Sequence, residues 1–375
     1  MPAPTPRIEI DLAKIEANAR IIVELCRKAG VDEVIGVTKG TLAHAGVARA
    51  MLRGGVGGLA ESRLENLARL REAGFAVPMT LLRLPSLSQV DEVVRLADRS
   101  LNSELETLRA LSRAATAAGR RHGVVLMVEL GDRREGLPPE EIAAAARLAA
   151  ELPGLDLVGV GTNLTCYGAV IPSPVNLGRL VAVADEVRRV TGRPVPIVSG
   201  GNSSSLPLVI KGLIPRGITE LRIGDAILRG RESAYGELVP GARDDTFTLV
   251  AEVIEVREKP SLPEGEIGRD AFWNVPTFVD RGVRRRAILA LGRQDVAPEN
   301  LAPLDPGMIV LGASSDHLLV DVAEAAGPVR LGQEIRFRPN YAGILQAMTS
   351  PYVHKTTVGE DGGGQRHPPL PGGAE

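Results

Sequence analysis

Short apolar segments alternate with longer segments of helical apolar spacing over residues 13–230. Eight of the short segments are predicted to be strands: VIGVTK (34–39), VGGLAE (56–61), MTLLRL (79–84), RSLNSE (99–104), VVLMVEL (124–130), LVGVGTNL (157–164), VPIVSGG (195–201) and ELRIGD (220–225). Intervening segments such as ELETLRALSRAATAAG have the apolar spacing of an amphipathic helix. Eight alternating units predict an α/β fold, a closed parallel (β/α)8 TIM barrel. An open doubly wound sheet is the alternative.

The pattern changes after residue 235, where β-rich segments follow one another across short turns. They predict a smaller C-terminal β domain over 236–355, which the isolated leading strand RIEIDL (7–12) joins. The barrel is then expected over 13–235. The Gly- and Pro-rich end of the chain, residues 356–375, is expected to be a disordered tail.

Composition narrows the class of protein. A chain of 375 residues accommodates one barrel and one smaller domain. The net charge of −2 does not point to nucleic acid or to an anionic membrane as a partner. The two cysteines form no disulfide framework, and they show no metal-ligand spacing with the five histidines. Without an apolar signal core or a membrane-spanning run, the cytoplasm is the expected compartment.

Lys39 is the first candidate for chemistry, because it is one of only six lysines and ends the first predicted strand. Side chains at the carboxyl ends of barrel strands meet at one mouth. A lysine that is partly desolvated there has a lowered pKa, which suits Schiff-base formation with an aldehyde. An arbitrary lysine is more often a solvated loop residue, but the other five occupy helices, a turn or the chain end.

The seventh predicted strand leads into SGGNSSSL (199–206), a segment of small and hydroxyl residues. Small residues let backbone N–H groups approach an anion, and the start of a helix adds a positive dipole end. Phosphate sites in barrels favour the loops after strands seven and eight, so this segment is predicted to be a phosphate cradle rather than a plain loop.

Arg222, in the eighth predicted strand, is the third candidate. A buried arginine in a barrel strand is unfavourable unless it is paired. Beside a pyridine nitrogen it would donate a hydrogen bond and leave that nitrogen unprotonated. A ring in this state suits removal and return of a Cα proton better than chemistry that needs a long-lived carbanion. A structural ion pair with Asp225 or Glu220 is the alternative.

Together these elements resemble the fold-type III pyridoxal phosphate (PLP) enzymes, the alanine racemase superfamily. The resemblance covers about residues 7–355 and is closest to the ornithine racemase-like branch. It lies in nine segments: IEIDLAKIEANA, GVTKG, LAESRLEN, MVELGDRREG, GVGTNLTC, SGGNSSSL, LRIGDAILRG, RRRAILALGRQDV and GASSDHLLVD. Each segment alone is weak evidence, whereas nine in this order are strong evidence.

The resemblance implies a role for each candidate. Lys39 would form the Schiff base with PLP and act as one Cα base, and Arg222 would face the pyridine nitrogen. Arg134 would hydrogen-bond the phenolate oxygen, and Asn163 would replace the histidine that alanine racemases place against the ring. The phosphate would be held by Asn202, Ser203, Ser204 and the backbone of Gly224, with Tyr352 as a further donor.

The chain departs from alanine racemases at two tyrosines. The position four residues after the lysine is Ala43, followed by His44. The second Cα base, a tyrosine of the partner subunit in alanine racemases, falls near DAFWN (270–274), which contains none. The SSDH segment (314–317) occupies the place of a loop presented to the partner's site. Asp316 or His317 is therefore the expected second acid–base group, unless SSDH is an ordinary turn. Asp270 and Cys166 are lesser candidates.

The resemblance implies a PLP-dependent amino-acid racemase that works as a homodimer with shared active sites. Ornithine is the first expected substrate, Asp316 a candidate for binding its terminal amine, and lysine, alanine and serine stay open. A decarboxylase of the same fold type is less consistent with Arg222, because decarboxylases place an acid opposite the ring nitrogen. A PLP carrier would lack the β domain. A catalytically inactive sensor stays open because of the lost tyrosines.

Overall fold

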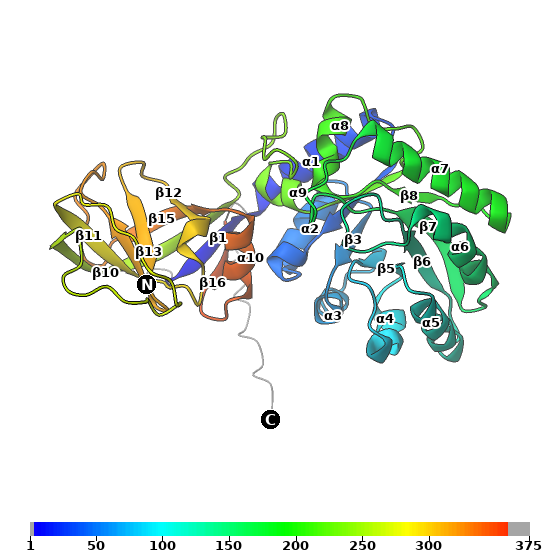
Figure 1. The fold of residues 1–375 in the computed structure, drawn as a ribbon, viewed down its shortest axis with the longest axis horizontal. Coiled ribbons are helices and arrows are strands. Elements are labelled where there is room, and N and C mark those ends of the chain that lie inside the picture. The colour runs from blue at the N-terminus through cyan, green and yellow to red at the C-terminus, as the bar shows by residue number, and fades with distance from the viewer. Residues whose placement is uncertain (1–3, 359–375) are drawn as a thin grey trace. The chain divides into compact units, whose positions relative to one another are not determined.

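The computed structural model describes residues 4–358, which form two compact units (Figure 1). One unit contains the chain up to Leu12 together with the chain from Asp245 onward, and the other spans Ala13–Asp244.

The larger unit is the predicted closed barrel of eight parallel strands, in the order in which they occur along the chain. The open doubly wound alternative is therefore wrong. The strands are β2 (Glu33–Val37), β3 (Gly58–Glu61), β4 (Met79–Leu81), β5 (Arg99–Asn102), β6 (His122–Met127), β7 (Leu155–Gly161), β8 (Ile197–Ser199) and β9 (Glu220–Ile223). The first and last strands, β2 and β9, pair in parallel and close the ring.

Helices follow the strands on the outside of the barrel (Figure 1). They are α1 (Leu12–Lys28), which precedes the barrel, and then α2 (Ala45–Arg53), α3 (Leu64–Glu72), α4 (Val90–Leu96), α5 (Leu105–Ala117), α6 (Ile142–Glu151), α7 (Pro174–Thr191), α8 (Leu206–Ile210) and α9 (Asp225–Arg229). Cys26 on α1 is fully buried, as its place in the helical pattern predicts.

The barrel unit continues beyond residue 235 to Asp244 because the added segment is bonded back to it. Asn18 of α1 donates to the carbonyl of Arg243 at 2.8 Å, and its Oδ1 accepts from the amide of the same residue at 2.7 Å. Arg231 forms an ion pair with Asp244 at 2.7 Å. Residues 236–244 are therefore part of the barrel unit rather than the start of the β domain.

The smaller unit is an eight-stranded sheet, as the β-rich pattern predicts. Its main path is β12–β15–β10–β11–β14–β13, and β1 and β16 extend it from β10. The strands are β1 (Arg7–Asp11), β10 (Phe247–Pro260), β11 (Val283–Ala290), β12 (Leu301–Pro303), β13 (Ile309–Ala313), β14 (His317–Asp321), β15 (Glu334–Pro339) and β16 (His354–Val358), with one helix, α10 (Tyr341–Thr349).

The leading strand β1 joins this sheet between two strands that come late in the chain. It pairs antiparallel with β10 and parallel with β16. Buried Arg7 forms an ion pair with Glu334 of β15 at 2.6 Å. The tail expected over 356–375 was placed too early, because residues 356–358 belong to β16; residues 359–375 lie outside the described chain.

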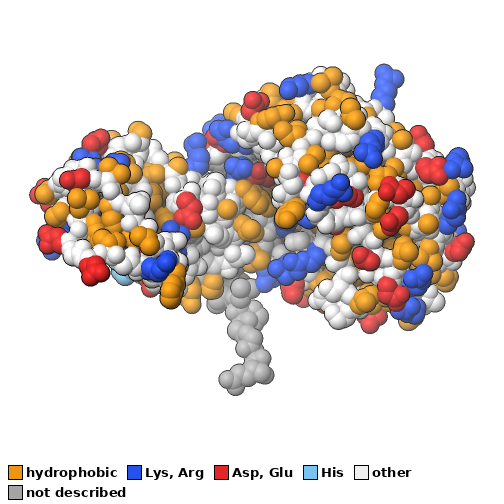
Figure 2. Space-filling view, viewed as in Figure 1, with side chains coloured by type: hydrophobic (Ala, Val, Ile, Leu, Met, Phe, Trp, Pro, Cys, Tyr) orange, Lys and Arg blue, Asp and Glu red, His pale blue; other side chains and the backbone are white. Residues whose placement is uncertain are grey.

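The described surface contains both signs of charge. Positive and negative side chains are interspersed over the face shown in Figure 2. None of the helices in residues 4–358 has both the length and the apolar character that a membrane span requires.

Candidate active site

Lys39 lies where the sequence places it, at the carboxyl end of the first barrel strand. Thr38 follows β2, and Lys39 opens a single 3₁₀ turn that ends at Leu42 in a left-handed conformation. Ala43 is also left-handed (φ 55°) and buried. Lys39 is half-buried, and its amine makes no hydrogen bond or ion pair within residues 4–358. The amine is therefore available to a ligand.

His44, which follows Ala43, has a structural role at the next helix. Its Nδ1 accepts from the amide of Val47 at 3.4 Å and caps the start of α2. Ala43 and His44 thus complete the turn after Lys39.

A buried carboxyl group beside Lys39 was not predicted from the sequence. Glu61, at the end of β3, accepts from Thr38 Oγ1 at 2.7 Å. Its other oxygen accepts from the Ser62 amide and from Asn66 Nδ2, both at 3.1 Å. Burial raises the pKa of Glu61, while these hydrogen bonds and the charge of Lys39 act in the opposite direction. The group holds the end of β2 against β3.

The predicted cradle forms a tight 3₁₀ turn over Ser203–Ser205, preceded by Gly201 at φ +104°. The side chain of Asn202 is engaged within the protein: Oδ1 accepts from the Ser204 amide at 2.8 Å, and Nδ2 donates to Asn163 Oδ1 at 3.0 Å. Asn202 therefore shapes the cradle instead of offering a free side-chain donor. Helix α8, which follows, is only five residues long.

Two buried polar atoms at the cradle lack a partner within the described chain. They are Oγ of Ser204, a residue that is 1% exposed, and Nδ2 of Asn163. Unpaired buried polar groups are unfavourable, so a pair of them in one place indicates a site that a polar ligand completes. Both belong to residues predicted to contact the cofactor.

The neighbouring strands are brought close around the cradle. Ser203 Oγ accepts from the Ala226 amide at 3.1 Å, which links the loop after β8 to α9. A Cβ on Gly224 would lie 3.0 Å from both the carbonyl oxygen and Cβ of Val37. Gly224 is thus required for close packing of the loop after β9 against β2, the strand that leads to Lys39.

Arg222 is 3% exposed and extends into the barrel. Its Nη2 donates to the carbonyl of Thr162 at 2.8 Å and its Nη1 to Oγ of Ser199. Burial lowers the pKa of Arg222, and the charge of Glu220 opposes that effect. Of the two ion-pair partners considered from the sequence, Asp225 pairs with Arg229 instead, and Glu220 reaches Arg222 only through Ser199.

Arg134 lies in the loop after β6 and pairs with Glu135. That pairing raises the pKa of Arg134, and the thiol of Cys166 is a further partner. The charges of Arg134 and Glu135 both act on the pKa of Arg222, Glu135 raising it and Arg134 lowering it.

Asp132 is a second structural residue that the sequence does not reveal. It is 1% exposed, and its carboxylate accepts from the amides of Tyr167 at 3.0 Å and Gly168 at 3.1 Å. A Cβ on Gly168 would lie 2.6 Å from the Asp132 carbonyl oxygen. The loop after β6 therefore fixes the loop after β7, which contains Asn163 and Cys166.

The remaining candidates belong to the smaller unit. Asp316 and His317 are exposed at the turn between β13 and β14. Asp316 accepts from Ser315 Oγ at 2.9 Å and from Gln294 Nε2, so it also stabilises the turn. Tyr352 is 63% exposed in the turn before β16.

Asp270 lies in an exposed loop of the same unit. It accepts from the amides of Phe272 at 2.9 Å and Asn274 at 2.8 Å, and these hydrogen bonds lower its pKa. Trp273, in the same turn, is 78% exposed. This geometry is that of an ordinary Asx turn.

Partial burial lowers the pKa of Lys355 to about 8. Its amine donates to the carbonyls of Val353, at 2.6 Å, and Ser350. These contacts indicate a structural role in the turn before β16, whereas Lys39 has no such partners.

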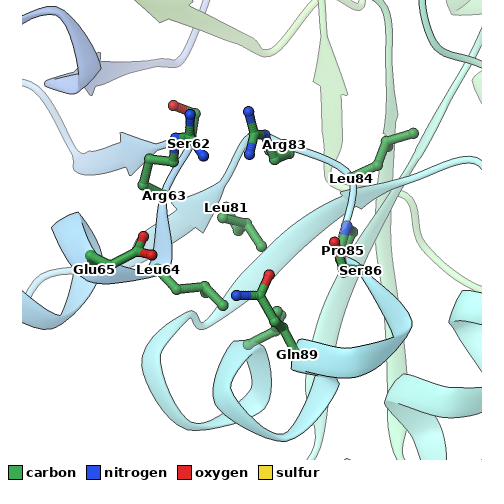
Figure 3. A pocket seen from close by; sticks show the side chains of 11 residues that line it. Ser62, Arg63, Leu64, Glu65, Leu81, Arg83, Leu84, Pro85, Ser86 and Gln89 are labelled. Atoms are coloured by element: carbon green, nitrogen blue, oxygen red, sulfur yellow. The ribbon is translucent and has the colours of Figure 1, made fainter. Parts of the chain in front are cut away.

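A pocket opens at the carboxyl ends of β3 and β4, the same end of the barrel as Lys39 (Figure 3). Arg63 and Arg83 line it above Leu81, and neither side chain makes a hydrogen bond or ion pair within the described chain. None of the site residues predicted from the sequence lines this pocket.

Comparison with known proteins identifies the family. The model of the alanine racemase N-terminal domain matches residues 10–231. The chain belongs to the alanine racemase family. Its racemase relatives include an ornithine racemase of Acetoanaerobium sticklandii, 45% identical over 93% of this chain and 99% of that protein. A lysine racemase of Thermotoga maritima is 41% identical over 93% of this chain and 98% of that protein.

Solved structures support the racemase fold. An alanine racemase from a D-cycloserine-producing Streptomyces lavendulae superposes with a TM-score of 0.74 at 18% identity, covering 96% of this chain and 98% of that one. A D-threonine aldolase from Filomicrobium marinum superposes with a TM-score of 0.71 at 17% identity, covering 97% of this chain and 94% of that one. Because the aldolase has the same fold, the fold alone does not determine the reaction.

Proposed function

We propose that the protein is a PLP-dependent amino-acid racemase whose preferred substrate is ornithine. The observation with most weight is the 45% identity to an ornithine racemase along almost the full length of both chains. Lysine is the second candidate substrate, because a lysine racemase is 41% identical over a similar length.

The residues at the mouth of the barrel fit PLP. Ser204 Oγ and Asn163 Nδ2 are buried without partners, as expected of donors that a phosphate and an aromatic ring would engage. Lys39 offers a half-buried amine without a partner, and Arg222 provides a fixed guanidinium deeper in the barrel. PLP would supply an electron-withdrawing ring that acidifies the Cα–H bond of a bound amino acid.

The protein's own groups would then position the substrate and move the proton. Lys39 Nζ would anchor the cofactor, and it would accept or return the Cα proton on one face. Arg222 would donate to the ring nitrogen and keep it unprotonated, which favours prompt return of the proton. Asp316 or His317 of a partner subunit would serve the opposite face, and this requires the homodimer expected from the resemblance.

The test is Cα-proton exchange in D2O with the L and D forms of ornithine, lysine, alanine and serine. Exchange with inversion that is fastest for ornithine is expected, together with a cofactor absorbance band. Both should disappear in Lys39→Ala. Lys28→Ala is the matched control, because Lys28 is exposed and pairs only with Glu24 on the same helix.

The rival functions predict different results. A cofactor absorbance band without Cα-proton exchange on any amino acid would indicate a PLP carrier or a sensor instead of a racemase. Formation of CO2 from the amino acid would indicate a decarboxylase. The cytoplasmic location stays a prediction that cell fractionation checks.

Shared active sites are tested by mixing subunits. A heterodimer of Lys39→Ala and Asp316→Ala chains contains one intact site if Asp316 acts on the partner's Lys39. Partial recovery of activity on mixing is therefore expected. No recovery, with dimers still present in sedimentation, would exclude Asp316 as the partner's second base, and the same experiment with His317→Ala would then test the alternative.

A further inference from the structure

A chain of polar side chains extends from Arg222 across the interior of the barrel. Arg222 Nη1 donates to Ser199 Oγ, and Ser199 Oγ donates to Glu220 Oε1 at 2.7 Å. The other oxygen of Glu220 accepts from Arg99, whose Nε donates to Thr80 Oγ1 at 2.7 Å. Because β5 and β9 are not neighbours in the closed barrel, the contact between Arg99 and Glu220 crosses its interior.

The chemistry of these groups permits one direction of hydrogen bonding. A guanidinium group only donates, so the Ser199 hydroxyl must accept from Arg222. Its single hydrogen is then directed to the carboxylate of Glu220. Arg222 is fixed a second time through the Thr162 carbonyl. The orientation of its remaining N–H groups is therefore determined by Ser199 and Thr162.

Charge balance gives Glu220 a second role. It is 3% exposed and lies between two arginines, Arg222 and Arg99. A nearby anion offsets part of the cost of burying a cation. Half-buried Glu33 adds a second acidic group beside Glu220 and Arg99. Burial, followed by the charge of Glu220, raises the pKa of Glu33.

We propose that Ser199 and Glu220 are positioning residues for Arg222. They hold its guanidinium aimed at the nitrogen of the PLP ring, with Glu220 acting through the Ser199 hydroxyl. This inference rests on the proposed function, since it assigns the target of Arg222.

The experiment compares Ser199→Ala and Glu220→Gln with wild type, using the pH dependence of the bound cofactor's absorbance, its dissociation constant, and kcat and KM. Both variants should shift the absorbance profile in the same direction and lower kcat at least tenfold, with KM little changed. The double variant should be no worse than either single one, because the residues act as one unit. Ser199→Thr keeps the hydroxyl and should restore the profile.

Ser100→Ala is the matched control, because Ser100 is a fully buried strand serine whose hydroxyl contacts His122 and Asn102 and not Arg222. It should change thermal stability without changing the spectrum. If Ser199→Ala behaves like Ser100→Ala, the positioning role is overturned. A spectral change in Ser199→Ala that Glu220→Gln does not share would overturn the role of Glu220. If wild type shows no cofactor band, it is the proposed function that fails. If Glu220→Gln does not fold, Ser199→Ala still removes the hydroxyl that connects Arg222 to Glu220 and tests the proposal alone.

Discussion

The hydroxyl of Thr38 donates to Oε1 of Glu61 at 2.7 Å, next to the lysine on which the proposed chemistry depends. Both residues are fully buried. In addition, the Thr38 amide donates to the Ala60 carbonyl at 3.1 Å. The backbone that leads into Lys39 is therefore attached to β3 through both main chain and side chain, which limits where the amine can lie.

Thr38→Val should lower the free energy of unfolding by about 1–3 kcal/mol, because the change leaves a buried carboxyl oxygen without its donor. Thr38→Ser keeps the hydroxyl and should retain most of the stability. Urea unfolding of the cofactor-free protein measures both. A valine variant as stable as wild type would mean that this hydrogen bond makes no net contribution.

Ser204→Ala should separate cofactor binding from stability. The Ser204 hydroxyl has no partner in the described chain, so its removal should change the free energy of unfolding by less than about 0.5 kcal/mol. The dissociation constant for PLP should rise about tenfold or more, because a hydrogen bond to a charged phosphate is lost. Ser205→Ala is the converse control: Ser205 Oγ donates to the Gly200 carbonyl at 2.7 Å, and its loss should cost about 1 kcal/mol of stability. Equal PLP binding in wild type and Ser204→Ala would remove Ser204 from the cradle.

His122 should make the protein less stable in acid. Its Nε2 lies 2.8 Å from Ser100 Oγ, and burial, followed by the charge of Arg120, lowers its pKa to about 4. Because the pKa falls below the unfolded value of about 6.5, the contribution to stability is present above pH 6.5 and is lost as the pH falls towards 4. This lowering of the His122 pKa corresponds to about 3 kcal/mol in the free energy of unfolding.

His122→Gln removes the titrating group and should remove this part of the pH dependence. The stability difference between wild type and variant is measured by urea unfolding at pH 7.5, 6 and 4.5. It should move in favour of the variant as the pH falls. A difference that is constant with pH would show that His122 does not titrate in this range.

The two cysteines should react at very different rates. Cys26 is fully buried, and burial raises its pKa to about 12, whereas Cys166 is exposed. A thiol reagent at pH 8 should modify one cysteine in the native protein and the second only on unfolding. Cys166→Ser should abolish the fast phase. Rapid modification of two thiols would contradict the burial of Cys26.

The barrel was predictable because each strand is a short apolar block with a helical segment after it, a pattern that local sequence determines. Helix α10 was missed although Asn340 caps it by accepting from the Gly343 amide at 2.9 Å. Strand β12 has only three residues, and it forms because β15 pairs with it. Tertiary pairing of this kind leaves little trace in the local sequence.

Within the candidate site, Lys39 and Arg222 were predicted from their place in strands, and their roles stay predictions. The engagement of the Asn202 side chain could not be predicted, because its partner Asn163 is 39 positions away in the chain. The same holds for Asp132, which accepts from amides 35 and 36 positions away. Ser199 and Glu220 were visible as polar residues in strands, but only the closed barrel brings them to Arg222.

The pairing of β1 constrains the order in which the protein can be completed during synthesis. This strand is made before the other described strands, yet its neighbours are β10, from Phe247, and β16, from His354. All the strands of the barrel unit emerge before either neighbour does. Residues 7–11 must therefore wait, unpaired and with Ile8 and Ile10 uncovered, until β10 and β16 have been made, and a ribosome that stalls after the barrel leaves this apolar edge open to chaperones or to other chains.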